Sequence, residues 1–147
     1  MRFHHTKNKG DLGVLKAQLD LYEKGYLILT PNTEHAPFDI VAYKEGKFLR
    51  VQVKYRAIKN ETILIKFSTS WADKNGTHIV QYDKNEIDLI CVYCPDTDKC
   101  YYINPKECNK NIVLRFSPPK SSQKSKINMA EDFLYIPEIN INNHKKE

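Results

Sequence analysis

The stretch 38–54 constrains the fold of this 147-residue chain more than any other feature, because its side chains alternate between apolar and polar on both sides of Glu45-Gly46. Alternation with a period of two is typical of a strand with one buried face. With Glu45 and Gly46 as turn residues, 38–43 and 47–54 form an antiparallel hairpin. Its apolar face consists of Ile40, Ala42, Leu49, Val51 and Val53.

The same turn sets the pairing of the polar residues. It places Asp39 opposite Gln52, with Cβ atoms about 5 Å apart. Lys54 follows on the same face, within diagonal reach of Asp39. A carboxylate, an amide oxygen and a backbone carbonyl can hold a hard cation such as Mg²⁺, and a lysine can act on a water or stabilise developing charge. The alternatives are a solvated surface, or a register shifted by one residue that turns Asp39 away.

A helix is predicted over residues 8–24, ahead of the hairpin. Asn8 is the expected N-cap, and Gly25 suits the left-handed conformation that ends a helix. Gly10 and Gly13 fit either a frayed start or the close approach of a backbone or phosphate. The stripe expected to face the core is Leu12, Leu15, Leu19 and Tyr22, flanked by Val14 and Leu21.

The remainder of the chain is dominated by predicted strands. They cover residues 26–30, 62–67, 87–94, 99–103 and 111–116, the last as an edge strand. Residues 31–37 and 68–77 are predicted loops, with Trp71 packed on the core in the second. A flexible loop is expected near 117–128, a helical turn at 130–134 and a frayed end at 140–147. We expect one domain, 1–147, of the α/β (α+β) class with a mixed sheet backed by the N-terminal helix.

Charge and cysteine content restrict the function classes. The net charge of +5 suits a phosphate-rich partner, although many soluble proteins carry such a charge. Cys91 and Cys94 form a CxxC on a predicted strand, where residues three apart face opposite sides, so buried thiols are favoured over a metal site. The sequence has no run of about 18 apolar residues and no apolar stretch behind its N-terminal charges, so we expect a cytoplasmic protein without a membrane partner.

Four motifs together resemble a known family. Lys9-Gly10 open the helix, Gly25-Tyr26 close it, Pro37-Phe38-Asp39 follow, and Val51-Gln52-Val53-Lys54 end the hairpin. This order resembles the PD-(D/E)XK nuclease superfamily, with its restriction-endonuclease-like core. Within it, the chain is most similar to group I intron homing endonucleases that have Gln in the third motif. The resemblance covers roughly residues 7–103.

The resemblance implies a metal-dependent endonuclease of double-stranded DNA that uses Mg²⁺ or Mn²⁺. Asp39 would be the metal-binding carboxylate, Gln52 a metal ligand in place of the usual acid, and Lys54 the catalytic lysine. The helix should supply a further acid. Asp11 is the candidate for that catalytic and metal-binding role, and Gln18 is a substitute. Val14 stands where relatives often have Glu.

Substrate contacts and assembly complete the expectations. Six basic residues are candidate DNA-binding residues, with solvated surface as the alternative: Lys7, Lys9, Arg56, Lys59, Lys66 and Lys74. Residues 68–81 could read bases in a groove. Cutting both strands favours a homodimer or homotetramer. A Holliday-junction-resolvase-like nuclease and a non-catalytic DNA-binding module on the same fold are the alternatives.

Overall fold

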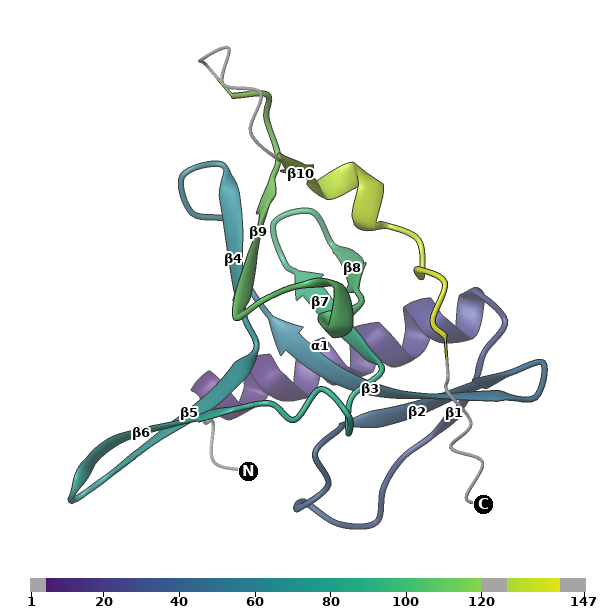
Figure 1. Cartoon of the computed structure of the whole chain (residues 1–147), viewed down its shortest axis with the longest axis horizontal. Coiled ribbons are helices and arrows are strands. Elements are labelled where there is room, and N and C mark those ends of the chain that lie inside the picture. The colour runs from purple at the N-terminus through teal and green to yellow at the C-terminus, as the bar shows by residue number, and fades with distance from the viewer. Residues whose placement is uncertain (1–4, 120–126, 141–147) are drawn as a thin grey trace.

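The computed structural model describes residues 5–119 and 127–140 as a helix and three sheets (Figure 1). The helix is α1 (His5–Glu23). The main sheet has the order β1 (Leu27–Leu29), β2 (Ile40–Lys44), β3 (Lys47–Tyr55), β7 (Leu89–Cys94) and β8 (Lys99–Ile103). A second sheet has the order β10 (Asn128–Met129), β9 (Asn111–Arg115) and β4 (Thr62–Lys66), and the third consists of β5 (Ser68–Asp73) and β6 (Gly76–Gln81). Two short 3-10 helices are η1 (Pro105–Glu107) and η2 (Ala130–Phe133).

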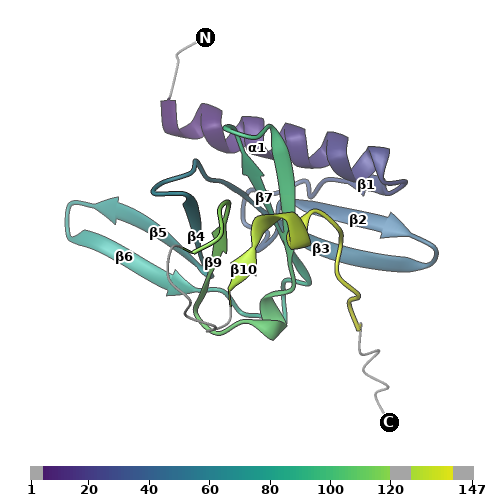
Figure 2. The same ribbon diagram turned by 90° about the horizontal axis from the view of Figure 1, so that it is seen from above.

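The main sheet is mixed, because β3 pairs with β7 in parallel while its other pairings are antiparallel. The helix α1 covers one face, and the second sheet lies against the other (Figure 2). Each face has its own hydrophobic cluster, one containing Ala17 and Leu21 of α1 and the other Ile63 and Ile65 of β4. The predicted mixed sheet backed by an N-terminal helix is therefore confirmed.

The β2–β3 hairpin has the predicted register. Tyr43 lies opposite Phe48 and Ile40 lies opposite Val51. Glu45 and Gly46 have φ of 50° and 81°, as a two-residue turn between twisted strands requires. Four residues of the predicted apolar face are buried against α1, namely Ile40, Ala42, Leu49 and Val51. Burial of each of the larger side chains stabilises the fold by about 1.5–3 kcal/mol.

The predicted buried face of α1 was wrong. The buried residues are Gly13, Ala17 and Leu21, whereas the whole predicted stripe, Leu12, Leu15, Leu19 and Tyr22, is exposed. Small residues let the helix lie close to β3: a Cβ at Gly13 would be 3.5 Å from the Cβ of Tyr55. Of the two explanations for Gly13, close approach of a backbone is therefore the correct one.

The prediction for the C-terminal end of α1 is confirmed, and the prediction for its N-cap was wrong. Gly25 has φ of 85° and follows the helix in the left-handed conformation, as predicted. Asn8 is not the N-cap, because it lies within α1.

Residues 68–77 are not a loop. They belong to β5 and β6, which pair from Ser68↔Gln81 to Asp73↔Gly76 and form a ribbon that extends away from the rest of the chain (Figures 1 and 2). Trp71 is exposed and stacks on His78 with ring centroids 5.2 Å apart, so the prediction that it packs on the core was wrong.

The C-terminal third follows the predicted order with two corrections, the first being that Asn128 of the predicted flexible loop begins β10. Strand β9 is not an edge strand, because it lies between β4 and β10. The predicted helical turn is η2. Residues 120–126 of the predicted flexible loop and 141–147 of the predicted frayed end lie outside the described residues.

Cys91 and Cys94 are buried on opposite faces of β7, as predicted. Cys91 packs in the cluster beneath α1, and Cys94 packs in the cluster beneath the second sheet. Within the described ranges, no helix is long and apolar enough to cross a membrane.

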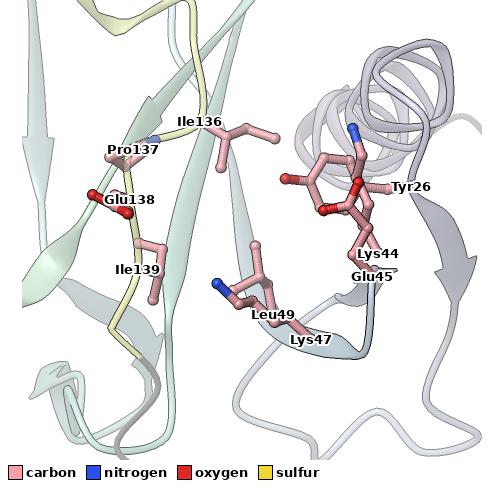
Figure 3. A pocket seen from close by; sticks show the side chains of 9 residues that line it. All are labelled: Tyr26, Lys44, Glu45, Lys47, Leu49, Ile136, Pro137, Glu138 and Ile139. Carbon is pink, nitrogen blue, oxygen red and sulfur yellow. The ribbon is translucent and has the colours of Figure 1, made fainter.

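A hollow of about 370 Å³ separates the β2–β3 turn from the segment 136–139 (Figure 3). Tyr26, Lys44 and Glu45 lie on one side of it, and the C-terminal segment lies on the other. This hollow is at the turn end of the hairpin. The open end, where Asp39 meets Gln52, contains the candidate site.

Candidate active site

Asp39 immediately precedes β2 and is tied to β3. Its backbone N–H donates to the carbonyl of Val51 at 2.9 Å, which extends the hairpin pairing by one residue. Its Oδ2 accepts hydrogen bonds from Gln52 Nε2 and from the backbone N–H of Val53, both at 2.7 Å. Asp39 and Gln52 therefore meet on the face opposite to α1, where the hairpin register predicted them.

The carboxylate of Asp39 is partly desolvated. Burial raises its pKa above the ordinary value, while the Val53 N–H, the charge of Lys54 and the Gln52 amide oppose that rise. Among the described residues, no lysine or arginine lies within salt-bridge distance of Asp39. A partly buried carboxylate without a directly bound cation favours a cationic ligand.

Lys54 is a buried lysine on the same face of β3. Its Nζ donates to Tyr82 Oη at 2.9 Å and to the carbonyl of Ser68 at 3.2 Å, and it lies 4.8 Å from the centre of the Tyr82 ring. Burial, then the charge of Arg56, lowers the pKa of Lys54 to about 8, and Asp39 opposes this shift. Near neutral pH, Lys54 can therefore both hold and release a proton.

Tyr82 is a site residue that sequence reasoning missed. It follows β6, and Ser68 begins β5, so both ends of the ribbon contact the ammonium of Lys54. Burial raises the pKa of Tyr82 to about 12, which keeps its hydroxyl protonated near neutral pH. The contact spans 28 residues of sequence, and no local pattern indicates it.

Arg50 and Asp88 form a second polar contact on this face. The guanidinium of Arg50 donates to both carboxylate oxygens of Asp88, at 2.8 and 2.9 Å. The backbone of Arg50 also exchanges hydrogen bonds with Asp88, through its N–H and its carbonyl. Burial alone would raise the pKa of Asp88, but these contacts with Arg50 bring it below the ordinary value. The pair fixes β3 against the start of β7 beside the site.

The predicted helix acid is not brought into this cluster. Asp11 is exposed on α1, which covers the opposite face of the sheet, and it is not among the groups that shift the pKa of Asp39. Gln18 is half-buried on the same helix, and Val14 packs in the cluster beneath it. The structure therefore brings together Asp39, Gln52 and Lys54 without Asp11.

The available donor atoms fit a divalent cation that prefers oxygen ligands. Asp39 offers a carboxylate and Gln52 an amide oxygen, and the described residues contain no group of three or more His, Cys, Asp or Glu placed to hold a metal. Mg²⁺ commonly binds through one or two carboxylates together with waters and substrate phosphates. A protein zinc site needs three or four nitrogen, sulfur or carboxylate ligands. The donor set therefore fits Mg²⁺ or Mn²⁺.

A basic groove of about 580 Å³ lies next to the C-terminal end of β3. Its lining within the described part of the chain includes four of the six predicted DNA-binding residues and no acidic residue: Lys9, Arg56, Lys59 and Lys66, with Tyr55, Ala57, Thr62, Leu64 and Ser70. Lys7 and Lys74 are exposed outside it, on α1 and at the tip of the ribbon.

A carboxylate, an amide and a buried lysine thus lie together at the open end of a helix-backed hairpin. The sequence profile of the PD-(D/E)XK endonuclease family matches residues 4–136. The chain therefore belongs to the PD-(D/E)XK endonuclease family, a family of nucleases.

One solved structure supports the same fold. The bacterial homing endonuclease I-Ssp6803I resembles this chain with a TM-score of 0.66 over 88% of each chain, at 17% sequence identity. At this identity the likeness concerns the fold. No curated protein matches the sequence significantly.

Proposed function

We propose that this protein is a metal-dependent endonuclease that hydrolyses phosphodiester bonds of double-stranded DNA at a specific site, as a homing endonuclease does. The observation that carries the proposal is the meeting of Asp39, Gln52 and Lys54, with the pKa of Lys54 near 8. Mg²⁺ or Mn²⁺, held by Asp39 and Gln52, would supply positive charge to the phosphate and lower the pKa of a bound water.

Lys54 supplies the proton chemistry in this proposal. Its lowered pKa lets Nζ accept a proton from the attacking water or, while protonated, stabilise charge on the phosphate. Tyr82 and Ser68 hold Nζ in place. A positioned group of this kind contributes about 10²–10⁴-fold to a rate.

The basic groove provides the means of placing DNA at the site. Lys9 and Arg56 line it from α1 and from the end of β3, and Lys59 and Lys66 line it from the segment that leads into β4 and from β4 itself. Tyr55 and Arg56 directly follow Lys54, so a phosphate backbone in this groove would run next to the site. Such contacts position the duplex, and their release of counterions makes binding fall steeply with salt.

A non-catalytic DNA-binding module is the second candidate, and one observation favours it. Gln52 replaces an acid and Asp11 is not in the cluster, so a metal ion would meet little negative protein charge. A junction-resolvase-like nuclease remains the alternative within the same chemistry. We further propose that two or four copies act together on a duplex, and that the protein acts in the cytoplasm.

The test must not depend on knowing the target sequence. Total genomic DNA is incubated with the protein in Mg²⁺, in Mn²⁺ or in EDTA, and new DNA ends are sequenced. Recurrent ends that require the metal are expected, and they should decrease about 10²–10⁴-fold in Asp39→Asn and Lys54→Ala. Lys47→Ala is the matched control, because Lys47 is an exposed lysine at the turn end of the same strand.

Binding of DNA is measured in parallel by fluorescence anisotropy over a series of salt concentrations. Salt-dependent binding without new ends would contradict the nuclease and favour the binding module. Ends that persist unchanged in both site variants would show that the chemistry lies elsewhere. Ends that occur only on four-way junctions would favour the resolvase-like alternative.

A further inference from the structure

A hollow of about 630 Å³, which we call the amide pocket, lies between the end of the ribbon and the start of β9. It is lined by Phe67, Gln81, Tyr82, Lys84 and residues 109–111. Among the described residues, its lining contains no carboxylate and shares no residue with the basic groove. The proposed chemistry makes no use of this pocket beyond Tyr82.

Hydrogen bonds between the walls of the amide pocket fix its shape. The backbone N–H of Tyr82 donates to the carbonyl of Phe67 at 2.9 Å, and the N–H of Phe67 donates to the carbonyl of Lys110 at 3.0 Å. Lys84 Nζ donates to the carbonyls of Cys108 and Asn109, the second at 2.8 Å. The two walls are therefore tied together, so the pocket is preformed, as ligand sites usually are.

The side chains of the amide pocket suit a nucleotide. Three exposed amides, Gln81, Asn109 and Asn111, each offer donors and an acceptor, and such amides pair with the edge of adenine. The half-buried ring of Tyr82 offers a surface on which a base can stack. Lys110 is exposed and can meet a phosphate, which no carboxylate of the lining would repel.

The amide pocket lies next to both the candidate active site and the basic groove. Tyr82 lines the pocket, and its Oη accepts from Lys54 Nζ at 2.9 Å. Gln81 pairs with Ser68, and Ser70 of the groove lining lies two residues further along β5, on the same face of the ribbon. The pocket and the groove therefore adjoin one face of the ribbon, and DNA held in the groove lies near the pocket.

We propose that the amide pocket binds one unpaired nucleotide of the DNA, turned out of the duplex, with its base on Tyr82 and the base edge on the amides of Asn109 and Asn111. This inference rests on the proposed DNA substrate and adds a subsite that the proposed cleavage does not require. Turning a base out of a duplex costs unstacking energy, and that cost is least for a base that is already unpaired. DNA with an unpaired nucleotide is therefore the preferred ligand.

The experiment compares three duplexes of one sequence by fluorescence anisotropy in EDTA, so that cleavage does not enter the result. One duplex is fully paired and one has a single extra adenine nucleotide. The third has a single extra abasic nucleotide, which keeps the sugar and the phosphate but has no base. We expect the wild type to bind the extra adenine about tenfold more tightly than the abasic nucleotide, because only the first supplies a base to stack.

Asn109→Leu/Asn111→Leu removes two amides of the pocket without changing any charge. It should abolish most of the preference for adenine over the abasic nucleotide, because the edge of the base would lose its hydrogen-bond partners. Binding of the paired duplex and its dependence on salt should stay the same. The matched control is Asn32→Leu/Asn140→Leu, at two exposed amides outside the pocket, and circular dichroism checks the fold of each variant.

Equal binding of the adenine and abasic duplexes by the wild type would overturn the inference, and so would a preference that survives the pocket substitutions. A preference lost equally in the control would also overturn it, because the amides of the pocket would then have no special role. These outcomes leave the proposed cleavage untouched. If the wild type bound none of the three duplexes, the proposed DNA substrate would be wrong as well.

Discussion

The two hairpins β2–β3 and β5–β6 have similar local pairing and opposite surroundings. Both are antiparallel with a two-residue connection, Glu45-Gly46 in the first and Lys74-Asn75 in the second. The first lies inside the main sheet, between β1 and β7, and packs on α1. The second pairs with no further strand among the described residues, and most of its side chains are exposed.

The two hairpins therefore differ in burial and not in pairing. Packing fixes the backbone of β3, and that backbone positions Asp39 through Val51 and Val53. A rigid support of this kind suits chemistry, which tolerates little displacement. The side chains of the ribbon, by contrast, are mostly open to solvent.

The largest effect is expected when isoleucine is replaced by alanine in one hairpin and then in the other. Ile40 in β2 is 0% exposed and Ile79 in β6 is 66% exposed. Ile40→Ala should lower the free energy of unfolding by about 3–4 kcal/mol through lost burial and a cavity, whereas Ile79→Ala should change it by less than about 0.5 kcal/mol. Urea unfolding followed by circular dichroism measures both. Equal losses would mean that the ribbon is packed as firmly as the sheet.

A second prediction concerns the effect of the buried Lys54 on the free energy of unfolding. Burial disfavours the charged form of Lys54, with a pKa of about 8 when folded against 10.5 for the unfolded chain. Lys54→Met should therefore raise the free energy of unfolding at pH 7 by about 1–3 kcal/mol, net of the lost hydrogen bonds. Between pH 8 and 10.5 the unfolded wild type binds more protons than the folded one, so wild-type stability rises with pH. The gap in stability between Lys54→Met and the wild type therefore closes over this range.

Chemical unfolding of both proteins at several pH values tests this sign. Lys106→Met is a control, because Lys106 is an exposed lysine outside this site. A gap that stays constant between pH 8 and 10.5 would contradict the lowered pKa.

The smallest expected effect lies where the two hairpins meet. Tyr82→Phe keeps the aromatic ring and removes the Oη that accepts from Lys54. Because that hydrogen bond favours the ammonium, its loss should lower the apparent pKa of cleavage and reduce the rate about tenfold. Rates measured over pH 6–10 check this, and Tyr135→Phe, at an exposed position, is the control. An unchanged pH profile would leave Tyr82 with only a structural role.

The sequence predicts the β2–β3 hairpin because its determinants are local. Two turn residues set the pairing, and alternation then assigns every side chain to a face. Asp39 and Gln52 meet for that reason alone. Tyr82 was beyond such reasoning, since it reaches Lys54 only after the chain has passed through β4, β5 and β6.

The helix and the ribbon show two different failures. In α1, the largest apolar residues were taken to be buried, but the close contact with β3 required small ones such as Gly13 and Ala17. In the ribbon, polar composition suggested a loop, although a glycine directly after the turn residues, as Gly76 is after Lys74-Asn75, is a recognised hairpin signal.

The parallel pairing of β3 with β7 also divides the site into local and non-local contacts. Asp39 and Gln52 belong to one hairpin, which can close within microseconds from neighbouring residues. Asp88 and Tyr82 come after β4, β5 and β6 in the sequence, so their contacts with Arg50 and Lys54 close loops of 38 and 28 residues. Such non-local closure is slow and raises contact order. The pair of Asp39 and Gln52 can therefore form from local contacts alone, while the buried setting of Lys54 requires the long segment between β3 and β7 to fold back.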